Sequence, residues 1–100
     1  MTRLIVHPKV AEEITDAAKW YREIDPDLAL RFLDEVYEGI RKAREMPLLF
    51  RIVENPYRRV LCDTFPYQIV FEIVEEMQTI HIVSVIHQKR HPDRWKEGLG

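Results

Sequence analysis

The sequence predicts an α+β fold in which a helical hairpin packs on one side of a twisted, mainly antiparallel sheet, in the order β-α-α-β-β-β. Two observations support this prediction. Before Pro47, apolar residues recur every three or four positions, as on one face of a helix, whereas after Pro47 they alternate with polar residues, as in strands. Prolines at the expected starts of both helices, and a third after the second helix, mark where the helical segments begin and end.

A short strand from Arg3 to Val6 opens the chain, and the first helix is expected from about Lys9 to Glu23, because Pro8 suits a first helical turn. Its apolar residues fall on one helical stripe, with acidic residues and a lysine away from it. The stripe consists of Val10, Ile14, Ala17, Ala18, Tyr21 and Ile24.

A second helix is expected to begin at Pro26, because Asp25 can cap it and Asp27 places negative charge at the positive end of the helix dipole. Cations near its end complement the dipole before Pro47 stops the helix. Because the link between the helices is so short, we expect an antiparallel hairpin. The apolar stripe is Ala29, Phe32, Leu33, Val36, Ile40 and Ala43.

Three further strands are expected after Pro47, at Arg58 to Asp63, Tyr67 to Val74 and Thr79 to His87. Successive side chains of a strand point to opposite faces. In the last strand we therefore expect one face to meet the core, made of Ile80, Ile82, Ser84 and Ile86. The opposite face would carry His81, Val83, Val85 and His87, and would end at a basic segment.

The composition indicates one folded domain spanning residues 1–100, with 46% hydrophobic and 32% charged residues and a net charge of -2. Cys62 is the single cysteine, so no internal disulfide forms, and a reducing compartment fits. No apolar run approaches the roughly 20 residues of a membrane helix, and the N-terminal apolar stretch is too short for a secretory signal. We expect a cytoplasmic protein without a membrane partner.

The sequence gives little support for a metal site or for a nucleophilic serine or cysteine. His81, His87, His91 and Cys62 are residue types that zinc accepts. However, six strand residues at about 3.3 Å each would place His81 roughly 20 Å from His87, too far for one coordination sphere. Ser84 and Cys62 lie inside predicted strands and are expected to pack. Glycine-rich phosphate loops are absent from the sequence. We expect no metal and no other cofactor.

The basic segment after the last strand is the remaining candidate site. Residues 87–96 hold four lysines and arginines against Asp93 alone. If the strands that carry Arg58 and Arg59 neighbour the last strand, these cations and His87 would line one side of the sheet and could neutralise phosphate charge or transfer protons. The alternative is a solvated strand end whose arginines pair with acids of the same fold. Trp95 is expected to pack the tail against the helices.

The sequence resembles the RelE/ParE superfamily of small bacterial toxins, the plasmid stabilisation proteins, over nearly the whole chain. The resemblance is carried by three stretches: "DPDLALRFLDEV" in the helical hairpin, "RRVLCDTFPYQIVFEI" from Arg58 to Ile73, and "IHIVSVIHQKRHPDRW" from Ile80 to Trp95. The combined pattern is an arginine, then Phe-Pro-Tyr, then an aromatic four residues later, then His-x-x-Arg-x-Pro-x-x-Trp.

The resemblance implies the toxin of a type II toxin-antitoxin pair, silenced by a cognate antitoxin protein. RelE-like members cut messenger RNA in the ribosomal A site without metal, whereas ParE-like members inhibit DNA gyrase and cleave nothing. By position, Arg58, His87 and Arg90 match the recurrent polar residues. In a metal-independent endoribonuclease, the two arginines would hold the scissile phosphate and His87 would aid proton transfer. Further contacts with nucleic acid or another target are expected from Arg51, Arg59, Lys89, His91 and Arg94.

Departures from the RelE pattern favour the gyrase-directed class. The second stretch reads "RVLCDT" where RNA-cutting members carry several cations, and the tail "KEGLG" supplies no tyrosine. The slightly acidic charge balance also disfavours entry into the ribosome, because a small protein that binds there profits from positive charge. The alternative from a different class is a non-toxic member that only binds an antitoxin, through an exposed sheet edge and an apolar groove. The sequence leaves the oligomeric state open.

Overall fold

The computed structural model of the chain describes residues 2–76, 78–90 and 94–97. The predicted order β-α-α-β-β-β is confirmed, with one short strand and two 3-10 turns in addition. The added strand lies in an exposed stretch of three residues, which is too short to give a clear alternating pattern. The elements are β1 (Arg3–Val6), α1 (Pro8–Ile24), α2 (Pro26–Glu45), η1 (Pro47–Leu49), β2 (Ile52–Glu54), β3 (Tyr57–Leu61), β4 (Tyr67–Val74), β5 (Thr79–His87) and η2 (Arg94–Lys96).

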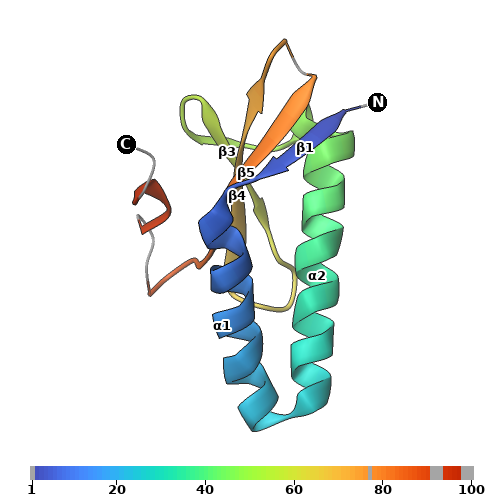
Figure 1. The fold of residues 1–100 in the computed structure, drawn as a ribbon, viewed down its shortest axis with the longest axis vertical. Coiled ribbons are helices and arrows are strands. Elements are labelled where there is room, and N and C mark those ends of the chain that lie inside the picture. The colour runs from blue at the N-terminus through green and yellow to red at the C-terminus, as the bar shows by residue number, and fades with distance from the viewer. Residues whose placement is uncertain (1, 77, 91–93, 98–100) are drawn as a thin grey trace.

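The five strands form one sheet in the order β1-β5-β4-β3-β2. β1 pairs parallel to β5, and all other neighbours are antiparallel. Figure 1 shows α1 and α2 side by side as an antiparallel hairpin, with the C-terminal segment beside α1 on the side away from α2. None of the helices in the described ranges is long and apolar enough to cross a membrane.

A single residue joins the two helices, as their spacing predicts. The backbone N–H of Asp25 donates to the Tyr21 carbonyl at the end of α1, and its Oδ1 accepts from the Asp27 N–H at the start of α2. Pro26 occupies the first position of α2, where no N–H is needed. At the other end of α1, His7 Nδ1 caps the helix by accepting from the Lys9 N–H.

The main core lies between the helical hairpin and one face of the sheet. Phe32 of α2 and Phe71 of β4 are fully buried there, and Gly39 lets α2 approach the sheet, because a Cβ at this position would clash with Ile69 Cδ1. Near the tip of the hairpin, four aromatic rings pack with centroids 4.8 to 6.3 Å apart: Tyr21, Phe32, Phe65 and Tyr67.

The predicted alternation of faces in β5 is confirmed as far as Val83 and wrong beyond it, because a β-bulge interrupts the strand. Phe71 pairs with Ile82, but the preceding β4 residue pairs with Ser84, so Val83 is an extra residue. After the bulge the faces exchange: Val85 joins the helix-side core, and Ile86 packs on the opposite face. His87 is thereby placed beside the core residue Tyr67.

The face of the sheet away from the helices carries a second, smaller apolar cluster. It contains Val70, Val83, Ile86 and Trp95, with Tyr57 packed against it. The expectation that Trp95 packs against the helices is therefore wrong. The burial of Trp95 was expected, but it packs against the other side of the sheet, because the bulge turns Ile86 to the face that Val83 already occupies.

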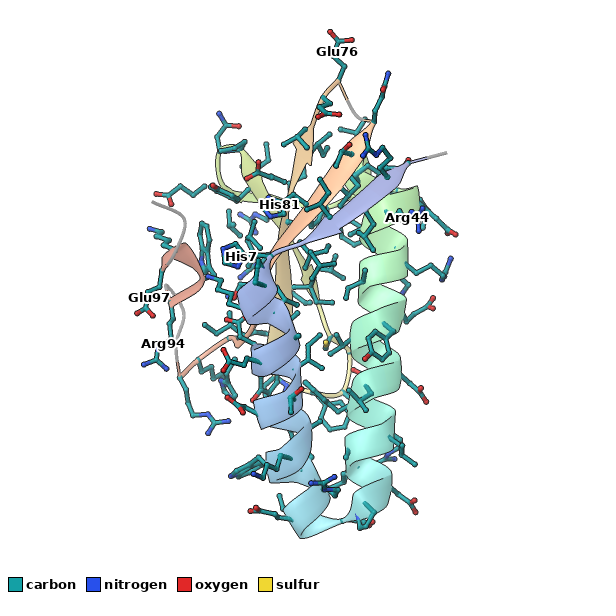
Figure 2. The ribbon with its side chains drawn as sticks, viewed as in Figure 1. His7, Arg44, Glu76, His81, Arg94 and Glu97 are labelled. Carbon is teal, nitrogen blue, oxygen red and sulfur yellow. The ribbon has the colours of Figure 1, made fainter. Side chains whose placement is uncertain are left out.

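Two lysines hold the segment that carries Trp95. Lys9 Nζ donates to the Trp95 carbonyl at 2.9 Å and to the Glu97 carbonyl, and Lys96 Nζ lies 3.1 Å from a Glu54 carboxylate oxygen. Figure 2 shows this segment, with Arg94 and Glu97, next to α1. The C-terminal segment is thus tied to the start of α1 and to β2.

Candidate functional site

A cleft of about 270 Å³ lies where β5 ends, between α1 and the segment that follows β5. Three sequence-predicted residues meet here, His87, Arg90 and Arg94. The bulge at Val83 explains the position of His87 on this side. The other polar or aromatic residues that line the cleft are Glu13, Asp16 and Trp20 from α1 and Tyr67 from β4.

His87 organises the turn that leaves β5. Its Nδ1 accepts the backbone N–H groups of Lys89 and Arg90, each at 3.0 Å. An Nδ1 that accepts hydrogen bonds places the proton of the neutral ring on Nε2. The ring also packs edge-to-face on Tyr67, with centroids 5.3 Å apart. His87 therefore fixes the turn that carries Arg90.

Arg90 is exposed and lies between two aromatic residues of the cleft. Its guanidinium carbon is 5.6 Å from the centroid of the Trp20 ring, which is a cation–π arrangement. Its positive charge also acts on the Tyr67 phenol, which lines the same cleft. Burial raises the pKa of Tyr67 although Arg90 acts to lower it, so the phenol stays neutral at pH 7.

Glu13 closes an open stretch of the β5 edge. β1 pairs with β5 only as far as Ile82, and beyond it a Glu13 carboxylate oxygen accepts the Val85 N–H at 2.9 Å. The two carboxylate oxygens also accept from Ser84 Oγ at 3.1 and 2.9 Å. Burial raises the pKa of Glu13, and the hydrogen bonds from Val85 and Ser84 offset part of that rise. Glu13 thus joins α1 to the strand that ends at the cleft.

Arg58 lies apart from this cleft. Its Nη1 donates to the Phe50 carbonyl at 2.8 Å, and it pairs across the sheet with Phe71. His87 lies about 13 Å further along the sheet and about 10 Å across it, or about 16 Å away between Cα atoms. The structure therefore does not bring Arg58 together with His87 and Arg90.

The remaining predicted contact residues are spread over different surfaces. Arg59 is on the face away from the helices, where its Nη1 is 3.4 Å from Gln68 Oε1. Arg51 is exposed before β2, and Lys89 is exposed in the turn after β5. Of the members of this group that the structure describes, Arg94 alone lines the cleft, from η2, with Nε 3.7 Å from a Glu97 carboxylate oxygen. His91 lies outside the described residues.

Within the residues that the structure describes, no group of three or more His, Cys, Asp or Glu side chains gathers to hold a metal ion. Cys62 is partly buried, and burial together with Glu35 and Asp63 raises the pKa of its thiol to about 11. The thiol is therefore protonated at pH 7, whereas a nucleophilic cysteine needs its thiolate.

The sequence prediction missed four residues of the cleft: Glu13, Asp16, Trp20 and Tyr67. A signal for three of them exists in the sequence. Positions 13, 16 and 20 follow the helical spacing of three and four, so they form a polar and aromatic stripe beside the core stripe of α1. What the stripe faces depends on the bulge in β5, which the sequence pattern does not indicate.

Comparisons with known proteins agree with this fold. The family described as the ParE toxin of the type II toxin-antitoxin system, parDE, matches residues 4–92. A solved structure of the chromosomal ParDE toxin-antitoxin system from P. aeruginosa aligns with a TM-score of 0.75 at 15% identity, covering 87% of this chain and 96% of that one. No curated protein sequence matches.

Two structures of a double-arginine mutant of the E. coli toxin RelE are also similar. The free mutant aligns with a TM-score of 0.52 at 11% identity, covering 88% of this chain and 84% of that one. The mutant in complex with a RelBc antitoxin peptide aligns with a TM-score of 0.50 at 11% identity, covering 99% and 95%. At such identities the likeness concerns the fold alone.

Proposed function

The chain belongs to the ParE toxin family of type II toxin-antitoxin systems, and from this premise we propose that it arrests bacterial growth by poisoning DNA gyrase. In this proposal it cleaves no nucleic acid itself and is silenced by a cognate antitoxin protein. The solved relatives come from toxin-antitoxin systems, and one of them holds an antitoxin peptide, which supports an antitoxin partner.

The observation that favours gyrase inhibition over RNA cleavage is that the arginines and His87 do not converge on one point. Metal-free RNA cleavage requires positive groups that converge on the scissile phosphate, so that they stabilise the charge of the transition state. Arg58 is about 16 Å from His87 and donates to a backbone carbonyl instead. In the cleft itself, the carboxylates of Glu13 and Asp16 lie among the cations.

The face of the sheet away from the helices does not supply a basic groove either. Its centre is filled by Val70, Val83, Ile86 and Trp95, which are all buried. The net charge of -2 adds to this argument, since proteins that track a phosphate backbone are usually basic. A protein target suits this surface better than RNA.

Cleavage of ribosome-bound messenger RNA is the second candidate, and one observation favours it. His87, whose imidazole can act as a proton donor or acceptor, shares the cleft with Arg90 and the Tyr67 hydroxyl. Such a site would work without Arg58.

Induction of this chain alone in growing bacteria tests the proposal. We expect growth arrest with gyrase trapped on cleaved DNA and with intact messages, read by covalent-complex recovery and by mapping messenger 5′ ends. New 5′ ends at codon boundaries with untouched gyrase would favour the second candidate. Soluble expression without arrest would favour a member that only binds its antitoxin.

The antitoxin partner is tested by co-expressing the small reading frame that adjoins the gene. We expect growth to recover and the two proteins to co-purify, whereas an unrelated antitoxin expressed at the same level serves as the control. Arrest that persists in the presence of the adjoining product would contradict its assignment as the antitoxin.

A further inference from the structure

We infer that the cleft between Trp20 and Arg90 docks a carboxylate-bearing segment of the target protein. This inference rests on the proposed function, because it names the surface by which a protein target would be held. It also adds Trp20, which was not among the sequence-predicted site residues, to the residues proposed to bind the target.

Trp20 is a large aromatic side chain that is exposed at the surface and contacts neighbouring side chains. Half of it is exposed, at 50%. Its ring nevertheless has a fixed setting, since it packs edge-to-face on Tyr21 with centroids 5.2 Å apart and has Arg90 over it at 5.6 Å. Tryptophan and arginine dominate the energetically important positions of protein interfaces, and a preordered pair loses little conformational entropy on binding.

Arg90 is equally well prepared to meet an anion. The turn that carries it is tied to His87 Nδ1, and its side chain rests between Trp20 and Tyr67. An arginine held in one plane can donate two parallel hydrogen bonds to a carboxylate. The neighbouring Lys89 is exposed and adds a positive charge at the same turn.

The acids of the cleft indicate which anion fits. The Glu13 carboxylate faces the β5 edge, where it accepts from Val85 and Ser84, while Asp16 is exposed on the same helix. A phosphate chain, with one negative charge at every nucleotide, would meet both acids. A single carboxylate of a peptide segment can reach Arg90, while the apolar side chains beside it in that segment contact Trp20. A cleft of about 270 Å³ admits side chains of a peptide segment but no folded domain.

The chain offers a matched control for each working residue. Tyr37 on α2 is an exposed aromatic, at 57%, that lines a different groove with Leu30 and Leu33. Arg31 is an exposed arginine on α2, also outside the cleft. Loss of an exposed aromatic or of one positive charge can therefore be separated from loss of the cleft.

The test measures binding of purified bacterial DNA gyrase to the wild-type protein and to four variants: Trp20→Ala, Arg90→Gln, Tyr37→Ala and Arg31→Gln. We expect Kd to rise at least tenfold for the first two and less than twofold for the controls. Wild-type binding with equal Kd values for all variants would overturn the cleft and leave the gyrase target standing. A wild type that does not bind gyrase would overturn the target.

A second measurement tests carboxylate binding in the cleft independently of gyrase. Poly-L-glutamate and a single-stranded RNA of equal length are titrated against the protein and against Trp20→Ala, whose remaining emission comes from the buried Trp95, so the difference follows Trp20. We expect poly-L-glutamate to change the emission, with the change lost in Arg90→Gln and in high salt. No change at any concentration, or tighter binding of the RNA at Trp20, would overturn the carboxylate occupant.

Discussion

The two tryptophans of the chain have similar local chemistry and different surroundings. Each has a cation 5.6 Å from its ring centroid, Arg90 for Trp20 and Lys96 for Trp95. Trp20 is 50% exposed in the cleft, whereas Trp95 is 4% exposed on the face of the sheet away from the helices. A cation next to an aromatic ring therefore does not show whether the ring binds a partner or packs in the core. The exposed fraction of the ring distinguishes these two roles.

The arginines divide in the same way. Arg58 is partly buried and donates to the Phe50 carbonyl, so its hydrogen bond joins β3 to the segment before β2. Arg90 is exposed in the cleft. We therefore assign Trp95 and Arg58 to stability and propose Trp20 and Arg90 for binding.

The largest effect is expected when Trp95 is replaced by alanine. The buried ring packs with Val70, Val83 and Ile86, and its loss should lower the free energy of unfolding by about 3 kcal/mol, the lower end for buried aromatic side chains. Trp20→Ala should cost less than about 1 kcal/mol, since the ring is half exposed. Urea denaturation measures both, and equal losses would contradict the division.

A smaller loss is expected for Arg58→Ala. Removing the guanidinium leaves the Phe50 carbonyl without this donor, so the free energy of unfolding should fall by about 1 to 2 kcal/mol. Arg51→Ala is the matched control, because that arginine is exposed nearby and should change stability by less than about 0.5 kcal/mol. A greater loss for Arg51 than for Arg58 would show that the hydrogen bond to Phe50 contributes nothing.

The smallest effect depends on pH and concerns Glu13. Its pKa is raised in the folded protein above the ordinary 4.5, so folding favours the protonated form, and the stability this gives is lost as the pH rises through the raised value. Glu13→Gln mimics the neutral form. Its stability relative to wild type should therefore improve between pH 4 and pH 7, by less than about 1 kcal/mol for a partly exposed group. A relative stability that falls over this range would contradict the direction of the shift.

Most of the fold could be predicted from the sequence, because local rules determine it. Asp25 and Pro26 mark the helix junction through capping and a fixed backbone angle, and the bounds of β4 and β5 follow from alternation. The bulge at Val83 could not be predicted, since no glycine or proline marks it and the β-branched Val83 continues the run of strand-forming residues.

The candidate site was predicted only in part for the same reason. Sequence proximity brings His87 and Arg90 together through a tight turn, and both line the cleft. Arg58 was grouped with them by the family resemblance and on the condition that its strand neighbours the last strand, whereas β4 lies between β3 and β5. Register, which depends on the bulge and on the pairing of Arg58 with Phe71, places it elsewhere. Trp20 was missed because its helical stripe acquires a partner only in the folded chain.

The toxin is proposed to act through the cleft at the end of β5. This proposal is tested most directly by the growth arrest that Arg58→Gln and Arg90→Gln cause, when each variant is induced alone at equal soluble and folded levels. We expect Arg58→Gln to arrest growth as the wild type does, whereas Arg90→Gln should require at least tenfold more protein for the same arrest. Full arrest by Arg90→Gln with loss of arrest by Arg58→Gln would contradict this proposal.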